Sequence, residues 1–109
     1  MSKSQRPLAE AERIVTAIGA DLAPFCARIQ VAGSVRRRTE VVGDIEMVAI
    51  PRYVPAGLFG DCTANLVWEH LHASDAYRFT KGDRANGCYY QLAPPMHAGL
   101  QLDLFLALA

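Results

Sequence analysis

The sequence predicts an α+β domain in which helices cover one face of a mixed sheet. Two observations support this fold class. The order of the apolar patterns along the chain is helix, strand, strand, helix and then three strands. The 109 residues, 51% hydrophobic and 20% charged, have the composition of an ordinary globular domain. A chain of this length can bury one core, so we treat residues 1–109 as a single domain.

The helices are predicted from periodicity and from residues that favour helix ends. Gly19 is expected to end the first helix, and a second short helical stretch is expected around 22–28. A later helix should run to about Ala73, with Asp61 or Thr63 as its N-cap. The first helix is predicted because apolar residues recur at helical spacing, namely Leu8, Ala11, Ile14, Val15 and Ile18.

The strands are predicted from short apolar or alternating runs. In Asp44–Ile50 polar and apolar residues first alternate and then become wholly apolar, as expected for a central strand whose first polar positions face a site. Residues 51–60 have the chemistry of turns. Tyr89 and Tyr90 should place one ring in the core and the other at the surface. The remaining predicted strands are 29–32, 77–80, 88–92 and 100–106, and turn-forming clusters separate the last three at 81–83, 86–87 and 94–95.

Charge and cysteine content limit the classes of function. Eleven basic and eleven acidic residues cancel, so the chain lacks the broad positive field that holds duplex nucleic acid across many phosphates. Cys26, Cys62 and Cys88 are odd in number, without a CxxC pair or an apolar leader, which indicates a reduced cytoplasmic protein. The histidines do not cluster with the cysteines in sequence, which argues against structural zinc.

Acidic residues on two predicted strands carry the strongest functional signal. Asp44 and Glu46 are two positions apart on a strand, so their carboxylates point to the same face. Like charges held together on a sheet are costly unless they are protonated or bound to metal, and oxygen ligands suit magnesium or manganese. Asp103 lies in an apolar run, where a carboxylate needs a partner. The alternatives are a solvent-facing strand edge for the first pair and a structural arginine partner for Asp103.

A second signal lies just upstream of the acidic pair. Gly33-Ser34 ends a strand, and a helix beginning there would present backbone N–H groups and a hydroxyl to a phosphate. The adjacent arginines, 36–38, could add bidentate phosphate contacts. The alternatives are that Ser34 is only a helix cap and that the arginines form a solvated face.

These residues together resemble the palm motif of family X DNA polymerases, of the polymerase beta kind. The matching elements are Gly33-Ser34, two following arginines, and Gly43-Asp44-Ile45-Glu46 at the same spacing. Leu102-Asp103-Leu104 resembles the third-carboxylate strand of that family. The likeness covers about residues 30–107. The double arginine and the spacing to the acids favour this family over minimal stand-alone nucleotidyltransferases.

The resemblance implies a nucleotidyltransferase fold with two divalent ions, Mg²⁺ or Mn²⁺. Asp44 and Glu46 would bind both ions, and Asp103 would bind the catalytic one and activate the primer 3′-hydroxyl. The reaction would join a nucleoside monophosphate to a hydroxyl and release pyrophosphate. Two positions depart from the family pattern. Glu46 is one methylene longer than the usual Asp, and Gln101 stands where the family usually has an arginine that orients the third acid.

The resemblance also implies the nucleotide contacts. Ser34 and Arg37 would contact the triphosphate, Gly33 would belong to the same turn, and Gly43 would offer its backbone N–H. The acceptor would be a DNA primer end or another hydroxyl.

Three classes of function stay open at this point. They are an active nucleotidyltransferase, a degraded palm that binds nucleotide without turnover, and an antitoxin-like module that acts through a partner. Neutral charge and small size favour dependence on a partner, and no membrane association is expected. The chain is apolar through its last residues, 104–109, so we expect either a fragment or a surface covered by another chain or a second copy.

Overall fold

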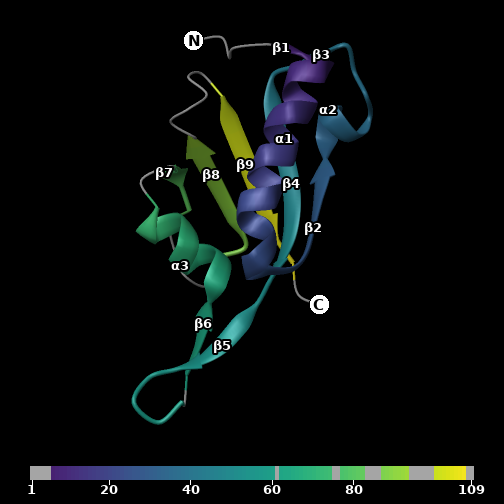
Figure 1. The fold of residues 1–109 in the computed structure, drawn as a ribbon. Coiled ribbons are helices and arrows are strands. Elements are labelled where there is room, and N and C mark those ends of the chain that lie inside the picture. The colour runs from purple at the N-terminus through teal and green to yellow at the C-terminus, as the bar shows by residue number, and fades with distance from the viewer. Residues whose placement is uncertain (1–5, 61, 75–76, 83–86, 94–99, 108–109) are drawn as a thin grey trace.

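The computed structural model describes residues 6–60, 62–74, 77–82, 87–93 and 100–107. These residues form an α+β domain built on a five-stranded mixed sheet of order β2-β4-β9-β8-β7 (Figure 1). Only the central pair, β4 and β9, is parallel. The predicted fold class and mixed sheet are therefore confirmed. The strands are β2 (Cys26–Ala32), β4 (Asp44–Pro51), β7 (Arg78–Lys81), β8 (Tyr89–Ala93) and β9 (Gln101–Leu106).

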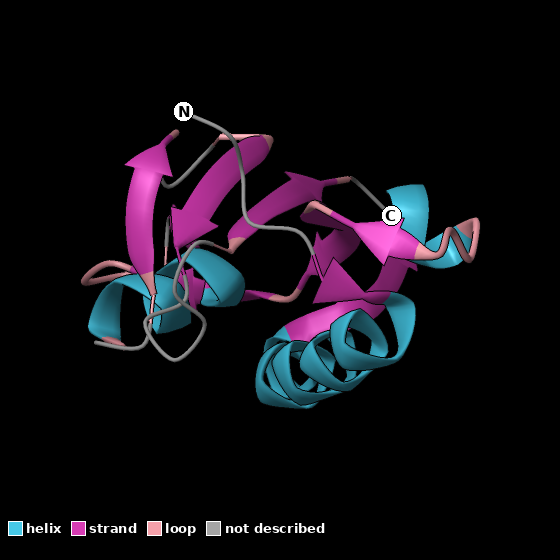
Figure 2. Ribbon diagram, turned by 90° about the horizontal axis from the view of Figure 1, so that it is seen from above, coloured by secondary structure: helices cyan, strands magenta, loops and turns pink. Residues whose placement is uncertain are grey.

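Two helices lie on the same side of this sheet (Figure 2). They are α1 (Leu8–Leu22) and α3 (Leu66–Ala73). The core between helices and sheet contains alternate residues of the inner strands, among them Ile45, Met47, Ala49, Tyr90, Leu92, Leu102 and Leu104. Because alternate strand residues point to opposite faces, the residues between them lie on the face that these helices leave open. That open face carries the predicted acids.

The first helix continues past Gly19, contrary to the prediction. A glycine in a helix interior costs about 1 kcal/mol relative to alanine. Burial of Leu22, which is 0% exposed, contributes roughly 1.5–3 kcal/mol and outweighs that cost. The expected second helix at 22–28 is only a 3₁₀ turn, Ala23–Phe25, because the chain already enters β2 at Cys26.

The predicted cap of α3 was also wrong. Asn65 is the N-cap, and its Oδ1 accepts a hydrogen bond of 3.1 Å from the backbone N–H of Trp68. Thr63 belongs instead to strand β6 (Cys62–Asn65), and Asp61 lies outside the described residues. The predicted end at Ala73 is confirmed.

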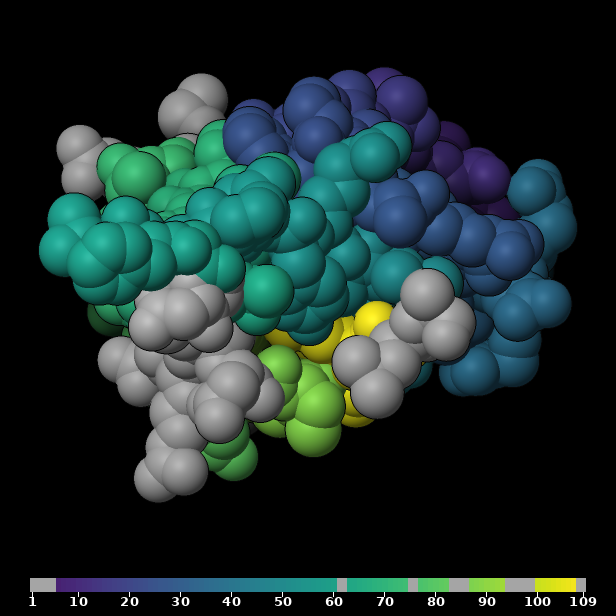
Figure 3. Space-filling view, turned by 90° about the horizontal axis from the view of Figure 1, so that it is seen from below, coloured from purple at the N-terminus to yellow at the C-terminus, as the bar shows by residue number. Residues whose placement is uncertain are grey.

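The segment predicted as turns contains a hairpin. Strand β5 (Tyr53–Ala56) pairs antiparallel with β6 in a separate two-stranded sheet. Leu58 and Phe59 at its tip are 89% and 86% exposed. The hairpin projects beyond the body of the domain in Figure 1 and forms the teal lobe at the left of Figure 3. It lies apart from the open face of the main sheet.

Two small elements complete the fold. Strand β1 (Arg6–Pro7) pairs with β3 (Val41–Val42), and the short helix α2 (Gly33–Arg36) follows β2. Several predicted turn positions, 83, 86 and 94–95, lie outside the described residues.

The apolar C-terminal run is only partly exposed. Phe105 is 42% exposed, whereas Leu104 is fully buried and Leu106 packs against the core. Strand alternation explains the difference, since Leu104 faces the helices and Phe105 the open side. The last two residues lie outside the described part, and a covering chain stays a prediction. None of the described helices has the length and apolar character needed to span a bilayer.

Candidate active site

The three predicted carboxylates lie together on the open face of the sheet. In the parallel pairing of β4 with β9, Glu46 is opposite Asp103, and Asp44 is opposite Gln101. Directly opposite positions on neighbouring strands are only about 5 Å apart. Asp103 is 8% exposed, and the other two acids are half-buried. The fold thus brings the predicted acids to neighbouring backbone positions.

Their side chains, however, do not converge. Across the described ranges, no three acidic, histidine or cysteine side chains come close enough to hold a metal ion. The Glu46 carboxylate lies over Gly33, where an added Cβ would be 2.6 Å from Oε2. Asp103 is instead engaged by Tyr89 and Gln101. Mutual repulsion of like charges favours such separation.

The donor set nevertheless fits hard divalent cations. Carboxylate oxygens are the ligands that Mg²⁺ and Mn²⁺ prefer, and the backbone positions that carry the three acids lie on neighbouring strands. The residues therefore fit a metal site in which the Glu46 carboxylate would turn from Gly33 toward Asp103.

Asp103 ends a hydrogen-bond chain that crosses three strands. The Tyr89 hydroxyl donates to Oδ1 at 2.6 Å, and Gln101 Nε2 lies 3.0 Å from Oδ1 and 3.2 Å from Oδ2. Gln91 Nε2 donates to the Tyr89 hydroxyl at 3.3 Å, and Thr80 Oγ1 lies within hydrogen-bond distance of Gln91 Oε1, at 2.9 Å, and of the Gln91 backbone oxygen, at 3.0 Å. The partners of Asp103 among the described residues are thus a phenol and an amide, not the structural arginine considered above.

Tyr89 was not predicted as a site residue. One ring of the pair was expected in the core and the other at the surface; the core position is confirmed, because Tyr90 is 0% exposed, whereas Tyr89 is half-buried. The hydrogen bond to Asp103, together with burial, raises the pKa of Tyr89. The phenol therefore stays a proton donor at neutral pH. One feature of the sequence could have indicated this role. In a strand Tyr89 and Gln91 point to the same face and Tyr90 to the other, so a core position for Tyr90 puts Tyr89 and Gln91 on the opposite face.

The Gly33-Ser34 turn adjoins the acids. Ala32, the last residue of β2, is the register partner of Glu46. Gly33 has φ +65°, which disfavours residues with a side chain. Ser34 is not the helix cap, because Ala32 occupies the N-cap position of α2. The Ser34 carbonyl accepts a hydrogen bond of 3.1 Å from the N–H of Thr39, and Thr39 Oγ1 lies within hydrogen-bond distance of the carbonyls of Ser34, at 3.2 Å, and Val41, at 3.1 Å.

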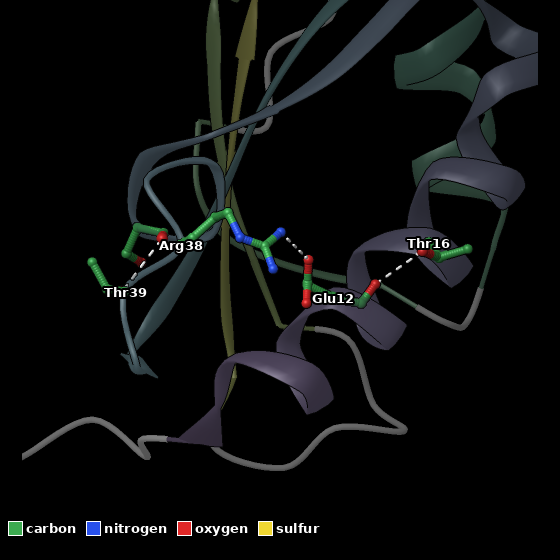
Figure 4. Close-up of polar contacts among 5 residues, drawn as sticks. Glu12, Thr16, Arg38 and Thr39 are labelled. Atoms are coloured by element: carbon green, nitrogen blue, oxygen red, sulfur yellow. Dashed lines mark hydrogen bonds and ion pairs between the residues drawn. The ribbon is translucent and has the colours of Figure 1, made fainter.

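The three arginines differ in their surroundings, although all are exposed. Arg38 extends to α1, where its Nη1 lies 3.2 Å from Glu12 Oε2 (Figure 4). In the part of the chain that is described, no ion pair involves Arg36 or Arg37. Arg37 follows α2 directly, and its N–H donates to the Gly33 carbonyl at 3.0 Å. Gly43, just before Asp44, has nothing within 4 Å of an added Cβ.

A separate polar cluster joins the two long helices. His70 Nε2 and the Tyr77 hydroxyl each lie 2.9 Å from Asp21 Oδ2, and the His70 ring stacks on Phe25 at 4.3 Å. Burial and the neighbouring Asp21 raise the pKa of Tyr77. The cluster connects α1 with α3 on the covered side of the sheet, away from the acids.

Comparison with known proteins adds no assignment, since neither a protein-family model nor a curated protein matches this sequence.

Proposed function

We propose that this chain is a metal-dependent nucleotidyltransferase with a polymerase beta-like palm. It would transfer a nucleoside monophosphate from an NTP or dNTP to a hydroxyl acceptor. The observation that carries the proposal is the parallel register of β4 and β9. This register sets Glu46 opposite Asp103 on the open face, beside the Gly33-Ser34 turn. Residues far apart in sequence thus occupy neighbouring backbone positions, which supports the proposed site.

The acids would be the metal ligands. Asp44, Glu46 and Asp103 would hold two Mg²⁺ or Mn²⁺ ions, which when bound neutralise phosphate charge and stabilise the attacking and leaving oxygens. Asp103 would also accept the proton of the acceptor hydroxyl. Its low exposure, 8%, keeps bulk water from competing for its oxygens.

The nucleotide would bind at the start of α2. Ser34 and Arg37 would contact the triphosphate, with the backbone of Gly33 and Gly43 approaching it closely, because neither residue has a side chain. The exposed guanidinium of Arg37 suits a phosphate oxygen pair. The neutral net charge favours contact with a primer end, or another small acceptor, over a long duplex.

One observation favours a second candidate, a palm that binds nucleotide without turnover and acts through a partner. Among the described residues, no three acidic side chains come close enough together to hold a metal ion. If the side chains kept these rotamers when nucleotide binds, the three carboxylates would not come together around a metal ion.

Titration with Mn²⁺ tests the first proposal. Asp44→Asn should weaken Mn²⁺ binding at least tenfold, because the amide removes a negative ligand from the pair. Glu40→Gln is the matched control, since it removes the same charge at an exposed position of the same segment and should leave binding unchanged. Equal Mn²⁺ affinity in Asp44→Asn and the parent would refute the proposed metal site.

A further inference from the structure

We propose that Tyr89 is a positioning residue for the third carboxylate. Its hydroxyl, together with the amide of Gln101, fixes Asp103 so that Oδ2 is the oxygen presented to a divalent cation. This inference rests on the proposed metal site.

The two oxygens of Asp103 are unequally engaged. Oδ1 accepts from the Tyr89 hydroxyl at 2.6 Å and lies 3.0 Å from Gln101 Nε2, whereas among the described residues Oδ2 has only the 3.2 Å contact with that same nitrogen. A bond of 2.6 Å lies in the range of strong charge-assisted O–H···O⁻ bonds. Each carboxylate oxygen has two acceptor sites. Those of Oδ1 are therefore filled, and Oδ2 keeps acceptor capacity for a cation.

The direction of the Tyr89 hydroxyl is set by its neighbours. Gln91 Nε2 donates to the phenol oxygen at 3.3 Å, so the single phenol proton is used on Asp103. Thr80 Oγ1 lies 2.9 Å from Gln91 Oε1 and 3.0 Å from the Gln91 backbone oxygen, so its single proton can serve either acceptor. A carboxylate only accepts hydrogen bonds, so the Tyr89 hydroxyl donates to Asp103 while its oxygen accepts from Gln91.

The ring of Tyr89 is held by strand pairing. Tyr89 is the register partner of Phe105, and their ring centroids are 5.0 Å apart. Gln91 is likewise the register partner of Asp103. The phenol is therefore positioned by the β8–β9 ladder before any ligand arrives, as an outer-shell partner of a metal ligand should be. Tyr89→Phe removes only the oxygen and retains the ring contact.

Direct Mn²⁺ binding, followed by electron paramagnetic resonance, tests the inference without requiring activity. Tyr89→Phe should weaken binding about 10- to 100-fold, the usual effect of losing an outer-shell partner. Gln101→Leu, which removes the other donor, should weaken binding in the same direction. Tyr53→Phe is the control, since this exposed phenol lies on hairpin β5–β6 and should leave Mn²⁺ affinity unchanged.

A double-mutant comparison separates positioning from general structural damage. If Tyr89 acts through Asp103, Tyr89→Phe should have no further effect on Mn²⁺ affinity in an Asp103→Asn background. A loss that persists in that background overturns the inference. So does unchanged or tighter binding by Tyr89→Phe in the parent.

The same measurements distinguish failure of this inference from failure of the proposed function. If Asp103→Asn binds Mn²⁺ as tightly as the parent, the metal site itself is wrong. If Asp103→Asn binds weakly while Tyr89→Phe binds normally, the metal site stands and only the role of Tyr89 fails.

Discussion

Replacing Gly33 by alanine perturbs the contact between the turn and the acids. Gly33 has φ +65°, a conformation that costs a residue with a side chain about 1–2 kcal/mol. The new Cβ would also lie 2.6 Å from Oε2, 2.7 Å from Cδ and 3.2 Å from Cβ of Glu46. The carboxylate end can rotate away, but the Glu46 Cβ moves only with its strand. We therefore expect Gly33→Ala to lower the free energy of unfolding by about 2–3 kcal/mol.

Thermal and urea unfolding measure this loss. A loss of 2–3 kcal/mol should lower the melting temperature by roughly 10–20 °C in a domain of this size. Gly43→Ala is the matched control, because nothing lies within 4 Å of its added Cβ and its φ is not positive. That substitution should change the unfolding free energy by about 0.5 kcal/mol or less.

A Glu46→Ala background separates the two contributions. That background removes the carboxylate but keeps the Glu46 Cβ, so Gly33→Ala should cost less than in the parent while retaining at least the backbone cost of about 1–2 kcal/mol. An equal cost in both backgrounds would show that the Glu46 carboxylate does not lie over Gly33. If Gly33→Ala and Gly43→Ala were equally stable, the positive φ at Gly33 would be wrong as well.

Two further predictions concern the affinity for nucleotide and the stability of the fold at alkaline pH. Arg37→Ala should weaken nucleotide binding by about 1.5–3 kcal/mol, measured by calorimetry, whereas Arg38→Ala, which removes the arginine paired with Glu12, should have a smaller effect. Equal losses would move the phosphate contact away from Arg37. Burial raises the pKa of Tyr90 to about 12, above the value of about 10 in an unfolded chain. Its contribution to stability is therefore complete below pH ~10 and is lost as the pH rises through about 12. Tyr90→Phe should flatten the decline of urea midpoints over this range, and an unchanged decline would contradict the assignment.

Local periodicity accounts for the parts of the fold that were predicted correctly. The predicted strand Asp44–Ile50 extends by one residue to Pro51, and its alternation is sufficient to put Asp44 and Glu46 on one face. The pairing of Glu46 with Asp103 could not be predicted from such alternation. Alternation fixes which face of a strand is buried, but it does not say that β4 and β9 are neighbours in the sheet. Only the resemblance linked these acids before the structure did.

The incorrect predictions share a physical cause, since each rests on a local signal that a tertiary contact outweighs. Gly19 signals a helix end, but the burial of Leu22 extends α1 past it. Pro55 signals a turn, yet it pairs with Thr63 in a two-stranded sheet, where edge positions tolerate proline. The role of Tyr89 was missed because it depends on which strand β8 pairs with.

The length of Glu46 connects the two halves of the candidate site. Its extra methylene, compared with aspartate, lets the carboxylate reach Gly33 at the end of β2, while its backbone position faces Asp103. Glu46 therefore cannot lie over the Gly33-Ser34 turn and join Asp103 at a cation at the same time. Under the proposed function, movement of Glu46 toward Asp103 would close the metal site and uncover the turn that binds phosphate. Metal and triphosphate would then favour the same rotamer of one side chain, so each would increase the affinity for the other.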